Sequence, residues 1–141
     1  MRRTLSLASL GALLAVLLLV NGTVGLAHHS TAAYADKTIT LKNAVVKKLV
    51  WSNPHTILSF DVKDARGKVT TWGVESGSPS ALSRVGWNRN SLKAGDTITV
   101  EIFAARNGAP VGRLAKVVLP GGAELLDSLY KASPFDTVQQ K

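Results

Sequence analysis

The chain has 141 residues, 45% of them hydrophobic, which suits a single domain that builds its own core. It has no cysteine, so the sequence excludes a disulfide framework and an acylated lipoprotein anchor. There are 17 lysines and arginines against 9 aspartates and glutamates, but the basic residues are dispersed, which argues against a nucleic-acid-binding arm.

The first 27 residues are predicted to be a Sec-type signal peptide. Arg2 and Arg3 give it a positive start, residues 5–20 form an apolar run, and residues 25–27 place small side chains before a cleavage site after Ala27. A retained membrane anchor is the alternative, although the run is short for a membrane span. We therefore expect a periplasmic or secreted protein that has no stable membrane insertion after cleavage.

Residues 28–37 are predicted to be an extended polar arm, and residues 38–126 to be the folded domain. The first strand is expected over residues 38–51. Its alternation of polar and apolar residues slips near Asn43 and Ala44, which indicates a bulge or a strong bend within one long strand.

A turn at Asn53-Pro54 leads into a predicted hairpin. Residues 55–63 alternate well, residues 64–67 form a turn with a late glycine, and residues 69–75 form the return strand. This alternation places the large apolar residues of both strands on one face, which we expect to be the inner face.

A short helix is predicted over residues 78–86. Ser78 is its expected N-cap, Pro79 takes the first helical position, and Gly86 ends it. The later strands and the tail are expected at residues 97–103, 113–119, 124–126 and 127–141.

This order of elements predicts an all-β domain, an OB-like five-stranded barrel with one short helix between strands three and four. An SH3-like barrel is the alternative. Trp51 and Trp72 are expected to be largely buried against the barrel, because large aromatic rings bury much apolar surface in a small domain.

Several short motifs are spread over the predicted domain. They are His28-His29-Ser30, Trp51-Ser52-Asn53-Pro54-His55, Trp72-Gly73-Val74-Glu75, Gly77-Ser78-Pro79, Gly86-Trp87 and Leu92-Lys93-Ala94-Gly95-Asp96. In this combination they resemble a family of small exported bacterial proteins that is classed only as a domain of unknown function. The resemblance implies a shared fold and export, but it implies no established activity.

The hairpin brings a histidine and a glutamate to the same end of its outer face. If one register holds, His55 lies directly opposite Glu75; if Phe60 pairs with Trp72 instead, His55 lies one diagonal away. The outer face of strands two and three is the usual binding surface of OB-like barrels. Both registers therefore predict that His55 and Glu75 belong to one site.

Copper is the cofactor that these residues favour. Cleavage after Ala27 would give His28 a free α-amino group, which can chelate a metal together with its imidazole, and His29 lies next to it. Copper(II) prefers nitrogen ligands in a tetragonal arrangement. His55 would complete the set, with Glu75 as a further ligand or as the group that orients an imidazole. Alternatively, His55 only caps the turn by donating to a carbonyl group.

A binding module without metal, for a peptide, glycan or protein, is the second hypothesis. Asn53 in the turn and Trp87 and Arg89 in a loop are its candidate ligand-binding residues, since an indole can stack on a ring and an arginine can meet an anion. Trp87 could instead close one end of the barrel.

The sequence has no cysteine nucleophile, Gly-x-Ser-x-Gly elbow or phosphate-binding loop. We thus expect a monomeric, noncatalytic protein whose partner is an envelope protein or small ligand, and no nucleic acid.

Overall fold

A computed structural model describes residues 31–130 of the chain. The predicted signal peptide, His28, His29 and residues 131–141 lie outside the described residues. The elements are η1 (Thr31–Ala33), β1 (Ile39–Val50), β2 (Ile57–Lys63), β3 (Val69–Glu75), α2 (Pro79–Ser83), β4 (Thr97–Ala104), β5 (Val111–Val118) and β6 (Glu124–Leu126). Over this range, no helix combines the length and the apolar composition needed to cross a membrane.

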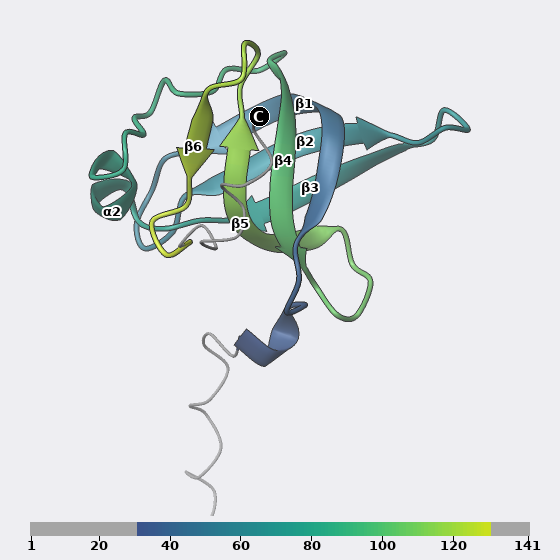
Figure 1. Ribbon diagram of the computed structural model, residues 1–141, viewed down its shortest axis with the longest axis horizontal. Coiled ribbons are helices and arrows are strands. Elements are labelled where there is room, and N and C mark those ends of the chain that lie inside the picture. Colours follow the sequence, from purple (N-terminus) through teal and green to yellow (C-terminus); the bar gives the residue numbers. More distant parts are fainter. Residues whose placement is uncertain (1–30, 131–141) are drawn as a thin grey trace, which may run out of the picture. The chain divides into compact units, whose positions relative to one another are not determined.

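Five strands close into a barrel (Figure 1). The sheet order is β3-β2-β1-β4-β5-β6, and a further parallel pairing between β3 and β5 joins the two ends. The short strand β6 adds to β5 outside this closed ring. The structure therefore confirms the predicted OB-like all-β barrel, with α2 between the third and fourth strands.

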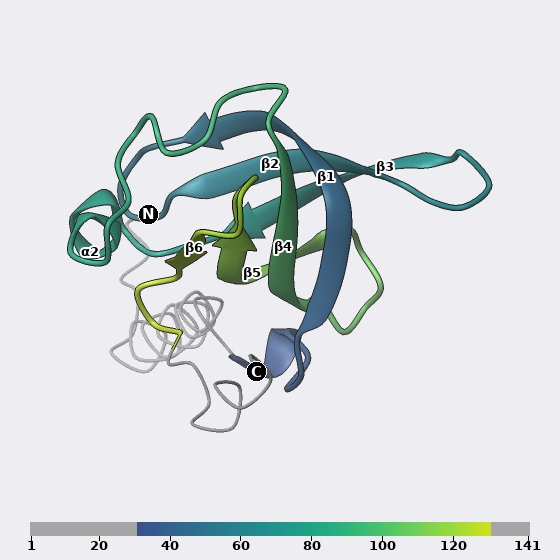
Figure 2. The ribbon, with the colours of Figure 1, turned by 45° about the horizontal axis from the view of Figure 1, so that its top comes forward.

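The first strand serves two neighbours because it bends. Its early residues pair with β4 and its late residues with β2, and its register with β4 shifts between Leu41 and Ala44. Asn43, inside this shift, has a φ of 55°, a backbone conformation that asparagine tolerates better than most residues. The predicted bulge is thus confirmed, and Figure 2 shows β1 curving along the barrel as a result.

The core consists of inward-facing residues of all five barrel strands, together with residues of α2 and of the loop that follows it. Its largest fully buried side chains include Phe60, Leu58, Leu82, Ile102 and Leu114. Their strand positions alternate with exposed or half-buried ones, as expected for side chains that point to opposite faces of a sheet.

Two of the tryptophans are less buried than predicted. Trp51 and Trp72 pack against the core but are only half-buried. Trp51 comes after the last residue of β1, and Trp72 precedes Gly73, where the pairing of β3 with β5 begins. Each ring therefore lacks a neighbouring strand on one side.

The hairpin of β2 and β3 extends beyond the barrel (Figure 2). Its turn is the predicted one, with Gly67 at a φ of 84°, which an L-residue with a side chain rarely adopts. Asp64 Oδ1 accepts hydrogen bonds from the backbone N–H groups of Arg66 and Lys68, each at 2.9 Å. The local sequence thus determines this turn.

The helix α2 begins as predicted, but it ends at Ser83, three residues before Gly86. The Ser78 side chain accepts a hydrogen bond from Ala81 N at 3.3 Å, Pro79 opens the helix, and Gly86, at a φ of 94°, follows it. Leu82 is the residue that α2 buries.

The second half of the predicted arm is attached to the end of β4. Tyr34 forms a bridge with Ala105, and Ala33 O accepts a hydrogen bond from Arg106 N at 3.0 Å. The Arg106 side chain adds an ion pair to Asp36 at 2.7 Å. The chain is therefore held against the barrel before β1 begins.

Gly112 lies where β3, β4 and β5 meet, in register with Val74 and Ala104. A methyl group at Gly112 would lie 2.7 Å from the backbone oxygen of Phe103 and 3.2 Å from Ile102 Cδ1. We predict that Gly112→Ala lowers the free energy of unfolding by about 1–3 kcal/mol, because the backbone of β4 would have to move. Urea denaturation measures this.

Gly73→Ala is the matched control on the neighbouring strand. No atom lies within 4 Å of the position that a methyl group at Gly73 would take. Its unfolding free energy should therefore stay within about 0.5 kcal/mol of the wild-type value. Equal losses in the two variants would contradict the view that the close contact between β5 and β4 makes Gly112 sensitive to a side chain.

Candidate functional site

The corner before β2 presents His55 at the surface. The peptide bond between Asn53 and Pro54 is cis, and Ser52 Oγ donates a hydrogen bond to His55 O at 3.3 Å. Beyond the corner, Thr56 N donates to Gly77 O at 3.1 Å, and Thr56 O accepts a hydrogen bond from Ser76 N at 2.9 Å. These bonds extend the pairing of β2 and β3 up to His55.

The register of the hairpin is the second of the two predicted. Phe60 pairs with Trp72 and Ile57 with Glu75, so His55 lies one diagonal away from Glu75. The two side chains meet across that diagonal, with His55 Nδ1 at 3.0 Å from Glu75 Oε1. The exposed fractions of these side chains are 34% and 29%, so the pair lies at the surface but is partly screened from water.

His55 Nδ1 has a second acceptor at hand. The Ser76 carbonyl oxygen lies 3.2 Å away, so Nδ1 faces two oxygen atoms that can only accept hydrogen bonds from it. This environment assigns a proton to Nδ1. In the neutral imidazole, Nε2 is then the nitrogen atom that carries the lone pair.

A buried carboxylate fixes the segment that carries Ser76. Asp127 is 3% exposed, and its Oδ1 accepts hydrogen bonds from Ser76 Oγ at 2.6 Å and from Gly77 N at 2.9 Å. Its Oδ2 accepts a third from Leu129 N at 3.0 Å. Hydrogen bonds to the barrel domain therefore continue beyond Leu126.

The other predicted site residues do not join His55 and Glu75. Asn53 and Arg89 are exposed, and no hydrogen bond or ion pair joins either of them to this pair. Trp87 is 2% exposed, and its indole Nε1 donates to Leu126 O at 2.8 Å. The prediction that Trp87 stacks on a ligand is wrong, because its ring lies in the core.

The residues that the structure describes do not form a complete metal site. Between residues 31 and 130, no group of three or more histidine, aspartate or glutamate side chains is placed to hold an ion. A metal at His55 would need ligands from elsewhere, and His28 and His29 lie outside the described residues.

A family model matches residues 15–114, and it is described as a family of unknown function (DUF6152). The chain belongs to this family. The match includes every motif on which the resemblance to such a family was based. No curated protein and no solved structure matches the chain. Membership in DUF6152 brings no established activity, so the function has to be argued from the chemistry of the residues.

Asp127→Ala tests whether the buried carboxylate holds this site together. Removal of the acceptor leaves three donors without it, at least one of them buried, so the free energy of unfolding should fall by about 3 kcal/mol. Chemical denaturation measures the loss. Asp64→Ala is the control, because Asp64 accepts two backbone hydrogen bonds in an exposed turn where water can replace it. A loss no larger than that of the control would show that Asp127 is not a structural anchor.

Proposed function

We propose that the protein is an exported binding protein of the cell envelope that holds a transition metal, copper in the first place. His55 would be its ligand on the barrel, and Glu75 would orient the imidazole. His28, as the first residue of the mature chain, and His29 would supply the remaining nitrogen atoms. Support comes chiefly from one observation, the pair of oxygen acceptors at His55 Nδ1.

This geometry suits a metal-binding histidine. Such a residue typically donates its second ring N–H to a carboxylate or a backbone carbonyl, which fixes the tautomer and the ring orientation. His55 has one acceptor of each kind, Glu75 Oε1 and Ser76 O. Glu75 is therefore proposed as the orienting partner, and Nε2 of His55 as the metal ligand.

The covalent length of the arm allows the proposed ligand set. Tyr34 is anchored to Ala105, at the end of β4, and it is six positions after His28 in the chain. Because residues 31–33 form η1, which rises about 2.0 Å per residue, this segment spans at most about 16 Å. His55 precedes β2, and β5 and β3 lie between β4 and β2, so the arm has to cross about 14 Å.

Copper(II) affinity should depend on the exact mature N-terminus. One extra residue before His28 keeps both arm imidazoles but moves the α-amino group, so the amine–imidazole chelate is lost and affinity should fall. Competition with a chelator of known affinity measures this, after intact-mass analysis has verified both N-termini. Equal affinity in the native and the extended protein would reject the chelate.

Glu75→Ala should weaken copper binding about tenfold, because the imidazole of His55 loses its orienting carboxylate. Glu75→Gln should lose less, since an amide oxygen can still accept the Nδ1 proton. Glu101→Ala is the matched control, because Glu101 pairs with Lys116 instead. Titration calorimetry compares the three variants with His55→Ala. The proposal fails if His55→Ala leaves the affinity unchanged, or if Glu101→Ala lowers it as much as Glu75→Ala.

A noncatalytic module for a peptide, glycan or protein is the second candidate. It is supported by the exposure of Asn53 and Arg89, which leaves both side chains accessible to a partner. Absence of any copper effect in the variants above would favour this candidate.

A further inference from the structure

A row of side chains crosses the outside of the barrel at the level of Glu75. The strand registers place Ile57 beside Glu75, Glu75 beside Arg113, and Arg113 beside Phe103, on β2, β3, β5 and β4 in turn. Residues in register on neighbouring strands point to the same face of a sheet. All four side chains are exposed or half-buried, so this face is the outer one.

Arg113 lies against an aromatic ring in this row. Its guanidinium carbon is 5.9 Å from the centre of the Phe103 ring. The Phe103 ring packs in turn against Tyr130, with the two ring centres 6.2 Å apart and the planes tilted by 59°. A guanidinium group that rests on a ring keeps its N–H groups, which lie in its plane, available for a ligand.

The surroundings of Arg113 differ from those of Lys116, the next outward-facing cation on β5. Lys116 Nζ lies 3.0 Å from Glu124 Oε1 and 3.4 Å from Glu101 Oε1, and the hydrogen bond with Glu124 raises the pKa of Lys116. Arg113 forms no ion pair with any carboxylate in residues 31–130. The half-buried guanidinium thus has an aromatic neighbour but no counter-ion in this part of the chain.

We propose that Arg113 and Phe103 form a subsite for the carboxylate group of an organic ligand. The planar guanidinium can bind both carboxylate oxygens at once, and the rings of Phe103 and Tyr130 offer contact to the apolar part of the ligand. Glu75 lies beside Arg113 and repels negative charge, which favours a singly charged carboxylate over a doubly charged phosphate. This subsite does not depend on a metal at His55.

Benzoate, titrated into the isotope-labelled protein in the presence of a metal chelator, tests the subsite by NMR. We expect saturable shifts of the backbone amide signals of Arg113 and Phe103. Benzamide, which has the same shape without the charge, should cause no saturable shift there. Arg113→Gln should weaken benzoate binding about tenfold or more, since it removes the charged pair of donors.

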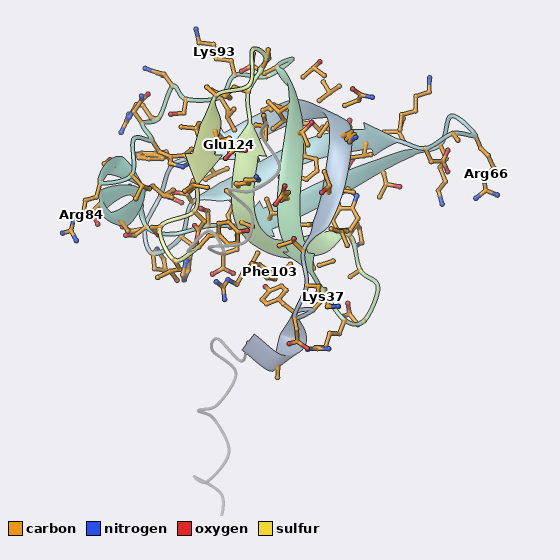
Figure 3. All side chains as sticks on the ribbon, viewed as in Figure 1. Lys37, Arg66, Arg84, Lys93, Phe103 and Glu124 are labelled. Carbon is orange, nitrogen blue, oxygen red and sulfur yellow. The ribbon has the colours of Figure 1, made fainter. Side chains whose placement is uncertain are left out.

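Arg84→Gln is the control for the loss of one positive charge. Arg84 is exposed and follows α2 directly, and Figure 3 shows it well apart from Phe103. This variant should bind benzoate as the wild type does. Arg113→Lys keeps the positive charge but loses the planar guanidinium group, so benzoate binding should weaken several-fold. If Arg113→Gln does not fold, the binding of benzoate to Arg113→Lys tests the subsite in its place. Equal binding of benzamide, an equal loss in Arg84→Gln, or unchanged binding in the Arg113 variants would overturn the proposal.

Discussion

The closure of the barrel depends on a short parallel pairing between β3 and β5. Only three residue pairs form it, beginning with Gly73 and Val111 and ending with Glu75 and Arg113. On its other side β5 lies close to β4 at the same level, where Gly112 has no side chain to meet the backbone of Phe103. The same pairing places Glu75 between His55 on one side and Arg113 on the other, so the candidate surface is a consequence of the closure.

Local features of the fold could be predicted from the sequence. The hairpin turn at Asp64, the cap of α2 at Ser78 and the bulge near Asn43 each depend on residues close together in the chain, and all three are present. The site was predictable to the same extent, because His55 and Glu75 lie on one hairpin and strand parity places them together. Parity alone left two registers open, and packing of the side chains determines which one forms.

The remainder depends on contacts between distant segments. Asp127 accepts hydrogen bonds from residues about fifty positions earlier, and nothing in its local sequence marks it as buried. Arg113 lies in register with Glu75 only because the barrel closes, so a strand-by-strand interpretation does not connect them. The tryptophans show the same limit, since hydrophobicity indicates that a ring is buried somewhere but not which of the three reaches the centre of the core.

The two interpretations of His55, a turn cap and a metal ligand, share one hydrogen bond. A histidine that only caps the corner needs a single acceptor, and Ser76 O provides it at 3.2 Å. Glu75 Oε1 lies closer, at 3.0 Å, although a half-exposed ion pair adds little stability. A carboxylate at that position has a clearer effect on the imidazole itself, because it holds the proton on Nδ1 and makes Nε2 a better electron donor. The position of Glu75 is thus better explained by the chemistry of the ring than by the stability of the turn.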